Sequence, residues 1–167
     1  MLLAGGTLDL GGYTVTNSIS GLGTLANGTL QTVISPAGEG ALGAESLTLN
    51  GATLAGTYRC DVTETGESDH VTFAGPTDLS GLTLEIVDAA ALSRTKTYTV
   101  ATLTGARTGT FTLDSQLDSR WHLAYAADGT VKGFFRATGV RPKFMDRLKA
   151  YGITVPDDTF DPSLIYE

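Results

Sequence analysis

The amino-acid sequence predicts an all-β solenoid, a fold in which short strands from successive coils stack on one another. Three observations favour this fold class. The 167 residues include 21 glycines and only 17% charged residues, a composition typical of many tight turns. Short segments rich in Thr, Val, Leu and aromatic residues alternate with these turns. One short pattern also recurs through the first half of the chain, whose length suits a single domain.

The predicted strands are short, alternate between apolar and polar residues, and are bounded by Gly, Asn, Asp or Pro. In chain order they cover residues 7–10, 13–16, 29–34, 46–49, 53–62, 70–73, 82–87, 97–103, 109–113, 121–125 and 130–136.

Pairs of turn-forming residues separate these strands. They are Gly11-Gly12, Asn27-Gly28, Asn50-Gly51, Gly75-Pro76 and Asp128-Gly129. Asn-Gly and Asp-Gly favour a positive φ, which lets a strand bend sharply without a long loop. We therefore expect consecutive strands to be close neighbours.

A sandwich or barrel of hairpins would also give short alternating strands, whereas a solenoid repeats one motif at about the spacing of a coil. Four segments share such a motif: a small residue, an apolar/Thr strand, a turn and a second strand. They are residues 5–16, 21–33, 45–56 and 69–81. This recurrence favours the solenoid. The apolar positions predicted to form its continuous buried ladder are Leu47, Leu49, Val71, Phe73, Leu82, Leu84 and Ile86.

The recurrence ends near residue 88 and divides the chain into three predicted parts. Residues 1–88 are predicted to form the coils. Residues 89–139 have longer strands and larger aromatic residues, which predicts a β cap over the exposed edge of the last coil. Residues 140–167 are predicted to form a short amphipathic helix and an acidic, extended tail.

The predicted helix begins at Pro142 and ends at Gly152, because proline suits the first helical position and glycine the stop. Its apolar side chains recur at helical spacing. Such a helix can cap the solenoid, dock on a neighbouring subunit or touch an anionic surface. The residues predicted to dock a partner, either another copy of the chain or another surface protein, are Arg141, Lys143, Phe144, Arg147, Leu148, Tyr151 and Phe160.

A family resemblance covers about two thirds of the chain. It is carried by "GTLQTVISPAGEGALGAESLTLNGATLAGTYRCDV", "SDHVTFAGPTDLSGLTLEIVD" and "KTYTVATLTGARTGTF". These stretches resemble the C-terminal part of autotransporter-type passenger regions with their associated β-helix repeats. The resemblance implies a right-handed parallel β-helix in a secreted or surface-displayed protein. Two departures are the lack of a following membrane β-barrel and Pro36-Ala37-Gly38 where the family has Pro-Gly.

Charge and composition exclude several function classes. The net charge is −7 and the isoelectric point is about 4.7, so we expect no nucleic-acid partner.

No apolar run is long enough for a transmembrane segment, and the N-terminus lacks a signal-peptide pattern. A Met1 that falls inside an apparent repeat suggests a fragment, a processed product or a chain shortened for expression. Cys60 is the only cysteine, so no internal disulfide is expected.

The densest group of ionisable residues lies in "DVTETGESDH", residues 61–70. Its carboxylates could hold calcium, but their spacing matches neither a helix-flanked calcium loop nor a calcium β-roll nonapeptide. A solvated turn is the preferred interpretation. The sequence predicts no metal and no cofactor.

A Ser/His/Asp arrangement can be written from Asp118, Ser119 and His122. No nucleophile elbow accompanies these residues, and His122 alternates with Trp121 on a predicted strand. The candidate acid–base residues for a polysaccharide-cleaving β-helix are scattered, so the sequence predicts no catalytic residue and no enzyme.

The sequence therefore predicts a non-enzymatic, adhesin-like structural module of a secreted or cell-surface protein, acting as a stalk or scaffold with a docking tail. The alternative is a carbohydrate-binding or carbohydrate-cleaving β-helix. In that case exposed Tyr58, Trp121 and Tyr125 would stack on sugar rings.

Overall fold

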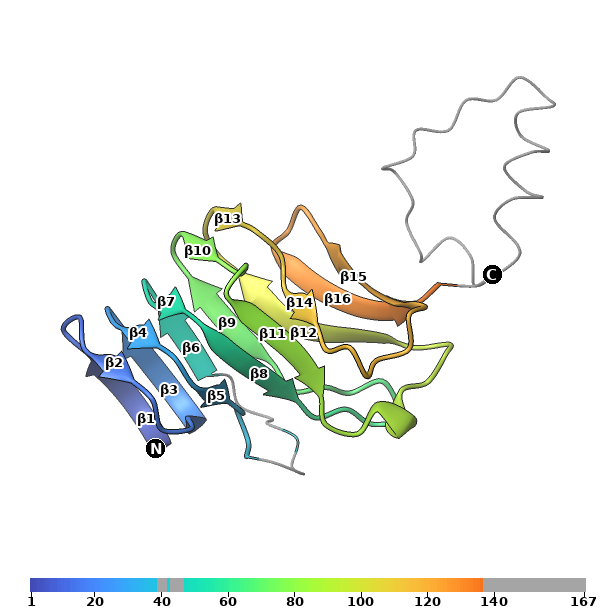
Figure 1. The fold of residues 1–167 in the computed structure, drawn as a ribbon, viewed down its shortest axis with the longest axis horizontal. Helices are drawn as coiled ribbons and strands as arrows, with labels where there is room; N and C mark the ends of the chain where they lie inside the picture. The colour runs from blue at the N-terminus through green and yellow to red at the C-terminus, as the bar shows by residue number, and fades with distance from the viewer. Residues whose placement is uncertain (39–41, 43–46, 137–167) are drawn as a thin grey trace, which may run out of the picture. The chain divides into compact units, whose positions relative to one another are not determined.

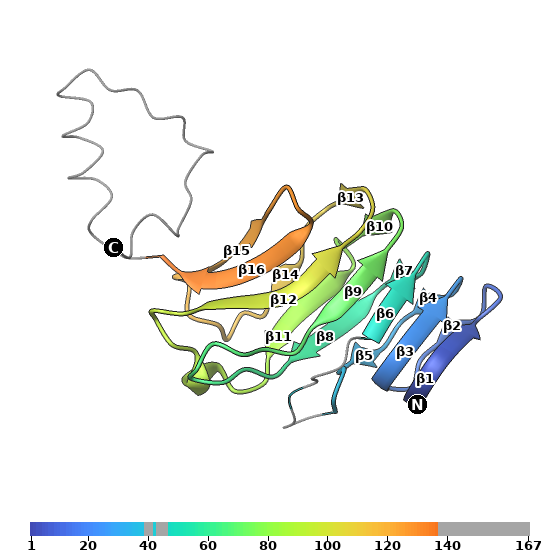
Figure 2. The ribbon, with the colours of Figure 1, turned by 180° about the vertical axis from the view of Figure 1, so that it is seen from behind.

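The computed structural model describes residues 1–38, 42 and 47–136, and most of their strands pair in parallel (Figure 1). The largest sheet, sheet A, has the order β1-β3-β6-β9-β12-β16-β15 and is seen best in Figure 2. Its strands are β1 (Leu2–Asp9), β3 (Ser20–Ala26), β6 (Leu47–Asn50), β9 (Val71–Ala74), β12 (Thr97–Leu103), β16 (Thr130–Phe135) and β15 (Trp121–Tyr125).

The other strands are short and lie beside sheet A. Sheet B contains β2 (Thr14–Val15), β4 (Thr29–Leu30) and β7 (Thr53–Leu54), and a separate pair contains β10 (Thr77–Asp78) and β13 (Arg107–Thr108). Sheet C contains β5 (Val33–Ile34), β8 (Gly56–Cys60), β11 (Leu82–Ile86) and β14 (Thr112–Leu113). A short 3₁₀ helix, η1 (Ala89–Ala91), follows β11.

The chain visits these sheets in a fixed order. We call a run of three strands, one in sheet A, one in sheet B or the β10–β13 pair, and one in sheet C, a rung. The described residues contain four rungs, which are β3-β4-β5, β6-β7-β8, β9-β10-β11 and β12-β13-β14. All pairing between successive rungs is parallel. An all-β fold with parallel sheets is therefore confirmed.

The core consists of apolar columns that run from rung to rung. Leu25 pairs with Leu49, Leu49 with Phe73, and Phe73 with Leu103. Because side chains alternate across a strand, residues in register point to the same side of the sheet. All seven residues of the predicted ladder are buried, with exposed fractions of 5% or less.

Threonines form a matching column on the other side of sheet A. Thr24, Thr48, Thr72 and Thr102 are in register on successive strands. They are half-buried, unlike the fully buried leucines beside them. Threonine suits this half-buried position because its branched side chain packs against the neighbouring strand and its hydroxyl can still form hydrogen bonds.

Three of the predicted turns follow strands of sheet A, and they lead to sheet B in two rungs and to β10 in the third. Asn27, Gly51 and Gly75 occupy equivalent places in three successive rungs, with φ of 54°, 63° and 75°. The backbone N–H of Asn27 donates to the Asn50 carbonyl at 3.1 Å, and that of Gly51 donates to the Ala74 carbonyl at 3.4 Å. The turns therefore continue the stacking of the strands.

The predicted strand ranges match most observed strands, but they leave out β3 and β10 and begin the strand at β14 too early, at Gly109. The predicted strands at 29–34 and 53–62 are each two strands, because the chain turns a corner within them. Parallel pairing also continues beyond residue 88, since β12 pairs with β9 and β14 with β11. Among the named strands of the described residues, antiparallel pairing joins only β12 with β16 and β16 with β15, a narrower region than the predicted cap at 89–139.

Candidate functional site

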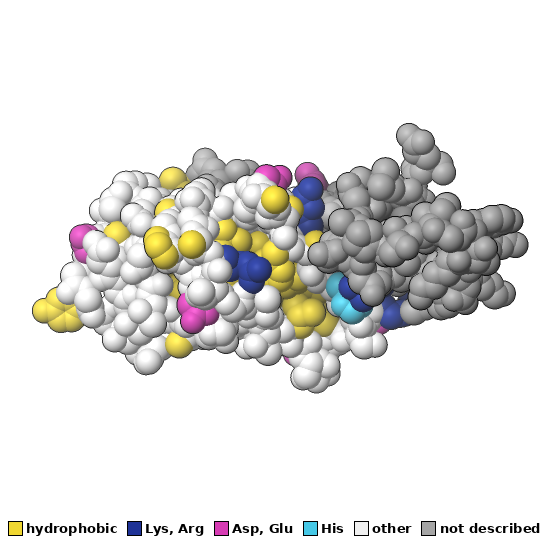
Figure 3. Space-filling view, turned by 90° about the horizontal axis from the view of Figure 1, so that it is seen from above, with side chains coloured by type: hydrophobic (Ala, Val, Ile, Leu, Met, Phe, Trp, Pro, Cys, Tyr) yellow, Lys and Arg dark blue, Asp and Glu magenta, His cyan; other side chains and the backbone are white. Residues whose placement is uncertain are grey.

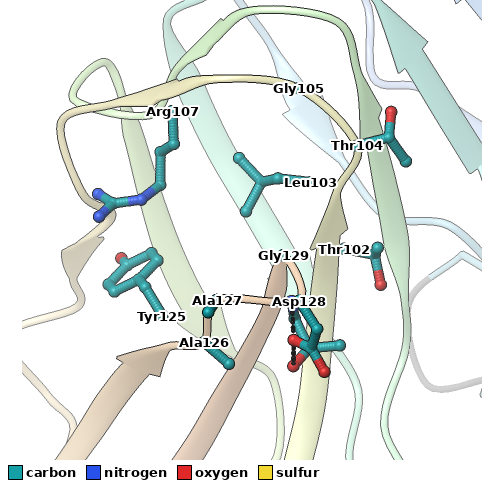
Figure 4. Close-up of a pocket in the computed structure, with 11 residues that line it drawn as sticks. Thr102, Leu103, Thr104, Gly105, Arg107, Tyr125, Ala126, Ala127, Asp128 and Gly129 are labelled. Atoms are coloured by element: carbon teal, nitrogen blue, oxygen red, sulfur yellow. Dashed lines mark hydrogen bonds between the residues drawn. The ribbon is translucent and has the colours of Figure 1, made fainter.

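A pocket of about 410 Å³ lies between the last rung and the β15–β16 hairpin (Figure 4). The pocket is lined by three segments, which are residues 102–105 at and just after the end of β12, Arg107 on β13, and residues 125–130 of the hairpin. Figure 3 shows the molecule from above, the side on which the β10–β13 pair lies in Figure 1. On this face, Lys or Arg side chains lie against a patch of hydrophobic side chains.

Two glycines bring the pocket's walls together. A Cβ at Gly105 would lie 2.4 Å from the carbonyl carbon of Gly75, so only glycine lets this turn pack on the rung below. A Cβ at Gly129, whose φ is +86°, would lie 2.0 Å from the Leu103 carbonyl oxygen. The backbone N–H of Leu103 donates to the Gly129 carbonyl at 2.8 Å. The hairpin turn is therefore held directly against β12.

Arg107 and Tyr125 form one side of the pocket. The guanidinium carbon of Arg107 lies 4.2 Å from the centroid of the Tyr125 ring, a distance at which a cation is attracted to an aromatic face. Arg107 also donates a hydrogen bond to the Gly109 carbonyl. The Tyr125 hydroxyl accepts a 2.9 Å hydrogen bond from the backbone N–H of Phe111. Both side chains are thus held in place without a ligand.

Burial raises the pKa of Tyr125, and the Phe111 hydrogen bond and the Arg107 charge oppose that rise. The phenol is therefore neutral at neutral pH. It supplies an aromatic surface and a polar atom, not a charge.

Asp128 lies on the opposite side of the pocket from Arg107 (Figure 4). Its Oδ1 accepts hydrogen bonds from the backbone N–H and the hydroxyl of Thr130, at 2.9 and 2.7 Å. These bonds lower the pKa of Asp128, so the carboxylate is ionised at neutral pH. The site thus presents a cation and an anion across an apolar floor that includes Leu103.

The three aromatic residues predicted to contact sugars do not come together. Tyr125 is half-buried and lines the pocket. Tyr58 and Trp121 are only 0% and 1% exposed, so the expectation that they are exposed was wrong. Tyr58 points inward from β8 and its hydroxyl donates to the Val100 carbonyl at 2.8 Å. Trp121 packs against Gly133, where it fills the space that a Cβ would take.

Sequence reasoning missed Arg107 and Asp128. Asp128-Gly129 was recognised as a turn, but its carboxylate had no evident partner. The two residues line the same pocket because the hairpin turn packs against the end of β12, and nothing in the local pattern of either segment indicates that arrangement.

The acidic segment 61–70 is a closed loop with a buried base. Val62 and Ser68 form an antiparallel bridge, and the backbone N–H of Asp69 donates to the Asp61 carbonyl at 2.8 Å. Asp61 and Asp69 are buried, whereas Glu64 and Glu67 are exposed. Within residues 1–38, 42 and 47–136, no group of three or more His, Cys, Asp or Glu residues is arranged to hold a metal ion.

Cys60 lies beneath this loop. It is buried, and its sulfur is 3.6 Å from the Asp69 carbonyl oxygen. Burial raises the pKa of the Cys60 thiol far above its ordinary value, so it is a poor nucleophile in the folded chain.

Other candidate chemical groups are engaged in local contacts. The Asp118 carboxylate accepts hydrogen bonds from the Arg120 side chain, including one of 2.9 Å from Nε, and His122 is in register with Phe134 on the neighbouring strand. Arg59 and Glu85 are in register on β8 and β11 and form a 2.9 Å ion pair.

The predicted docking residues at 141–160 lie outside the described residues. In the part of the chain that the structure describes, no helix has the length and apolar character needed to cross a membrane.

Comparison with known proteins adds no family or relative. No family model matches the chain, and neither the curated proteins nor the solved structures give a significant match.

Proposed function

We propose that the chain is a non-enzymatic structural module, a right-handed parallel β-helix that serves as a stalk or scaffold in a secreted or cell-surface protein. The number of stacked rungs would set its length. Each rung would present its inner apolar residues and its strand edges as the template for the next.

The observation that supports this proposal is the register between rungs. The same inner column passes through Leu25, Leu49, Phe73 and Leu103. The outward positions beside it are threonines, which serve sheet packing in every rung. Similar residue types therefore recur at the positions where successive rungs contact each other, as expected of a chain selected to stack its rungs.

Deleting one whole rung tests the proposal. Removal of residues 47–70 would place Val71 where Leu47 stood, because Gly23 pairs with Leu47 and Leu47 pairs with Val71. We expect this variant to fold cooperatively into a shorter module. In urea its free energy of unfolding should fall, and its denaturant dependence should decrease with the smaller buried surface.

Deleting half a rung is the matched control. Removal of residues 47–58 would bring the end of β8 to the place of β6 and put every later strand out of phase. This variant should give no cooperative transition by far-UV circular dichroism. If both deletions behave alike, the rungs are not interchangeable units and the proposal fails.

Location at the cell surface is supported by the resemblance to autotransporter-type passenger regions and needs its own test. An antibody raised against the chain should label intact cells of the source organism, and protease added to those cells should remove the signal. Labelling only after the cells are opened would contradict it.

A further inference from the structure

We propose that the pocket formed by Arg107, Tyr125 and Asp128 binds a carboxylated sugar, such as a uronic acid residue of an acidic polysaccharide. This binding activity is separate from the structural role proposed above, because it depends on the contact between the last rung and the hairpin.

Arg107 supplies the group that recognises the carboxylate. No acidic residue among those described forms an ion pair with Arg107, and the residue is exposed. One part of its guanidinium is fixed by the Gly109 carbonyl and by the Tyr125 ring. A guanidinium fixed in this way offers its remaining N–H groups in a planar fork that matches a carboxylate.

Asp128 sets a second requirement on the bound molecule, which must place hydroxyl groups and no negative charge beside this carboxylate. Its Oδ1 is held by Thr130, whereas Oδ2 accepts no hydrogen bond from the described residues. An ionised carboxylate of this kind accepts hydrogen bonds from hydroxyl groups and repels a second carboxylate. The bound molecule must therefore carry its negative charge toward Arg107 and its hydroxyl groups toward Asp128.

The floor between these two residues favours a ring with a partly apolar face. Leu103 lies between Arg107 and Asp128 in Figure 4, and the methyl groups of Ala126 and Ala127 complete that surface. A sugar ring has C–H groups on its faces and hydroxyls at its rim. A uronic acid adds one carboxylate to these, and so matches the cation, the apolar floor and the hydroxyl acceptor together.

Isothermal titration of the full chain with trigalacturonate tests this inference. The methyl ester of the same trisaccharide is the matched ligand, because it keeps the rings and hydroxyls and lacks the charges. We expect the acid to bind and the ester to bind roughly tenfold more weakly or worse, as expected on loss of a charged hydrogen bond. Sialyllactose, whose carboxylate is placed differently on the sugar, shows whether any acidic sugar suffices or a uronic acid is needed.

Variants at Arg107 identify the site. Arg107→Gln should lose roughly tenfold or more of the affinity for trigalacturonate, and Arg107→Lys should recover only part, because lysine keeps the charge without the fork. Arg94→Gln removes an exposed arginine outside the pocket and should bind as the unmodified chain does. An unchanged thermal midpoint shows that the fold is intact.

Three results would overturn the inference. They are the absence of binding by trigalacturonate, equal binding of the acid and its ester, and equal loss of affinity in the Arg94 and Arg107 variants. Equal binding of a glutamate-rich peptide would assign the pocket to acidic proteins instead of sugars. None of these results bears on the rung deletions, so the two proposals succeed or fail separately.

Discussion

His70 shows how a single half-buried side chain can make stability depend on pH. It is half-buried, and its Nε2 lies 2.9 Å from the Thr102 hydroxyl on the next rung. Burial lowers the pKa of this imidazole below its ordinary value of 6.5. The unfolded chain therefore binds more protons than the folded chain as the pH falls through 6.5, and the contribution of His70 to stability, complete above that value, is progressively lost below it.

We predict that the free energy of unfolding decreases between about pH 7 and pH 5, and that His70→Gln reduces this decrease. Glutamine can still bond to the Thr102 hydroxyl but does not titrate. Urea titrations at the two pH values measure the difference for both chains. If the variant and the unmodified chain lose the same stability, His70 is not the group responsible.

Gly133 lies on β16 and does not have the positive φ of the turn glycines. A larger residue is excluded there by lack of space and not by backbone conformation. A Cβ added there would lie 1.9 Å from Cζ2 of Trp121, which is only 1% exposed. The indole cannot move outward without exposing its buried surface.

We predict that Gly133→Ala lowers the free energy of unfolding by at least about 1–3 kcal/mol, the usual cost of overpacking. Tryptophan fluorescence during urea unfolding measures it directly, since Trp121 is the only tryptophan. Lys132→Ala, at the exposed preceding residue, should change stability little. Equal effects of the two substitutions would contradict the packing argument.

At the scale of the element, the sequence predicts the strands and turns that recur along the chain. It does not predict contacts that form only when distant segments pack together. The strands at 97–103 and 121–125 were predicted with the bounds that the structure has, because apolar residues alternate through each of them. The Asn-Gly turns were also evident from residue type. By contrast, the corner within 53–62 was missed because Ala55, where the chain changes sheets, is not a turn-forming residue.

The residues of the pocket could not be predicted from the sequence for the same reason. Tyr58, Trp121 and Tyr125 look alike in the sequence, since each is an aromatic residue on a strand. Their exposure depends on which face of the strand meets the interior and on whether another strand covers them. Only Tyr125 reaches the pocket, and its partner Arg107 comes from β13 of the last rung, whereas Tyr125 lies on β15 of the hairpin.

Strand β11 tests whether the inner columns hold the rungs together. Leu84 is fully buried and in register with Tyr58 on one side and Leu113 on the other. Leu84→Asp removes its packing and places an unpaired carboxylate in the interior, costs that together approach the whole stability of a typical domain.

We therefore predict that Leu84→Asp abolishes cooperative unfolding, as measured by circular dichroism in urea. Thr83→Asp, one residue earlier on the opposite side of β11, should cost roughly 1 kcal/mol or less. Glu64→Gln in the exposed turn should be neutral. Similar stability of the Leu84 and Thr83 variants would show that the two sides of the strand are not distinguished by burial.

At the scale of the whole molecule, the two ends of sheet A differ. At one end the antiparallel β15–β16 hairpin follows the last parallel strand. At the other end β1 pairs on one side only, and Leu2 and Tyr13 are 77% and 79% exposed. The register of β1 shifts between Ala4 and Thr7, an irregularity that discourages another strand from pairing with an edge.

Self-association therefore has two candidate origins, the β1 edge and the predicted docking helix with Phe144, Leu148 and Tyr151. The register shift in β1 favours the helix. We predict that the full chain self-associates and that a chain ending at residue 136 does not, because it lacks the apolar and basic residues of that helix.

Light scattering as a function of concentration measures the mass of both chains. The shortened chain should keep its urea transition, because residues 1–135 form a compact unit by themselves. A Leu2→Lys, Tyr13→Ser variant of the full chain is the control, since it makes two exposed apolar positions polar, one on β1 and one just before β2, and leaves residues 137–167 intact. Association that survives the truncation and disappears in this variant would assign the contact to β1 and reject the docking helix.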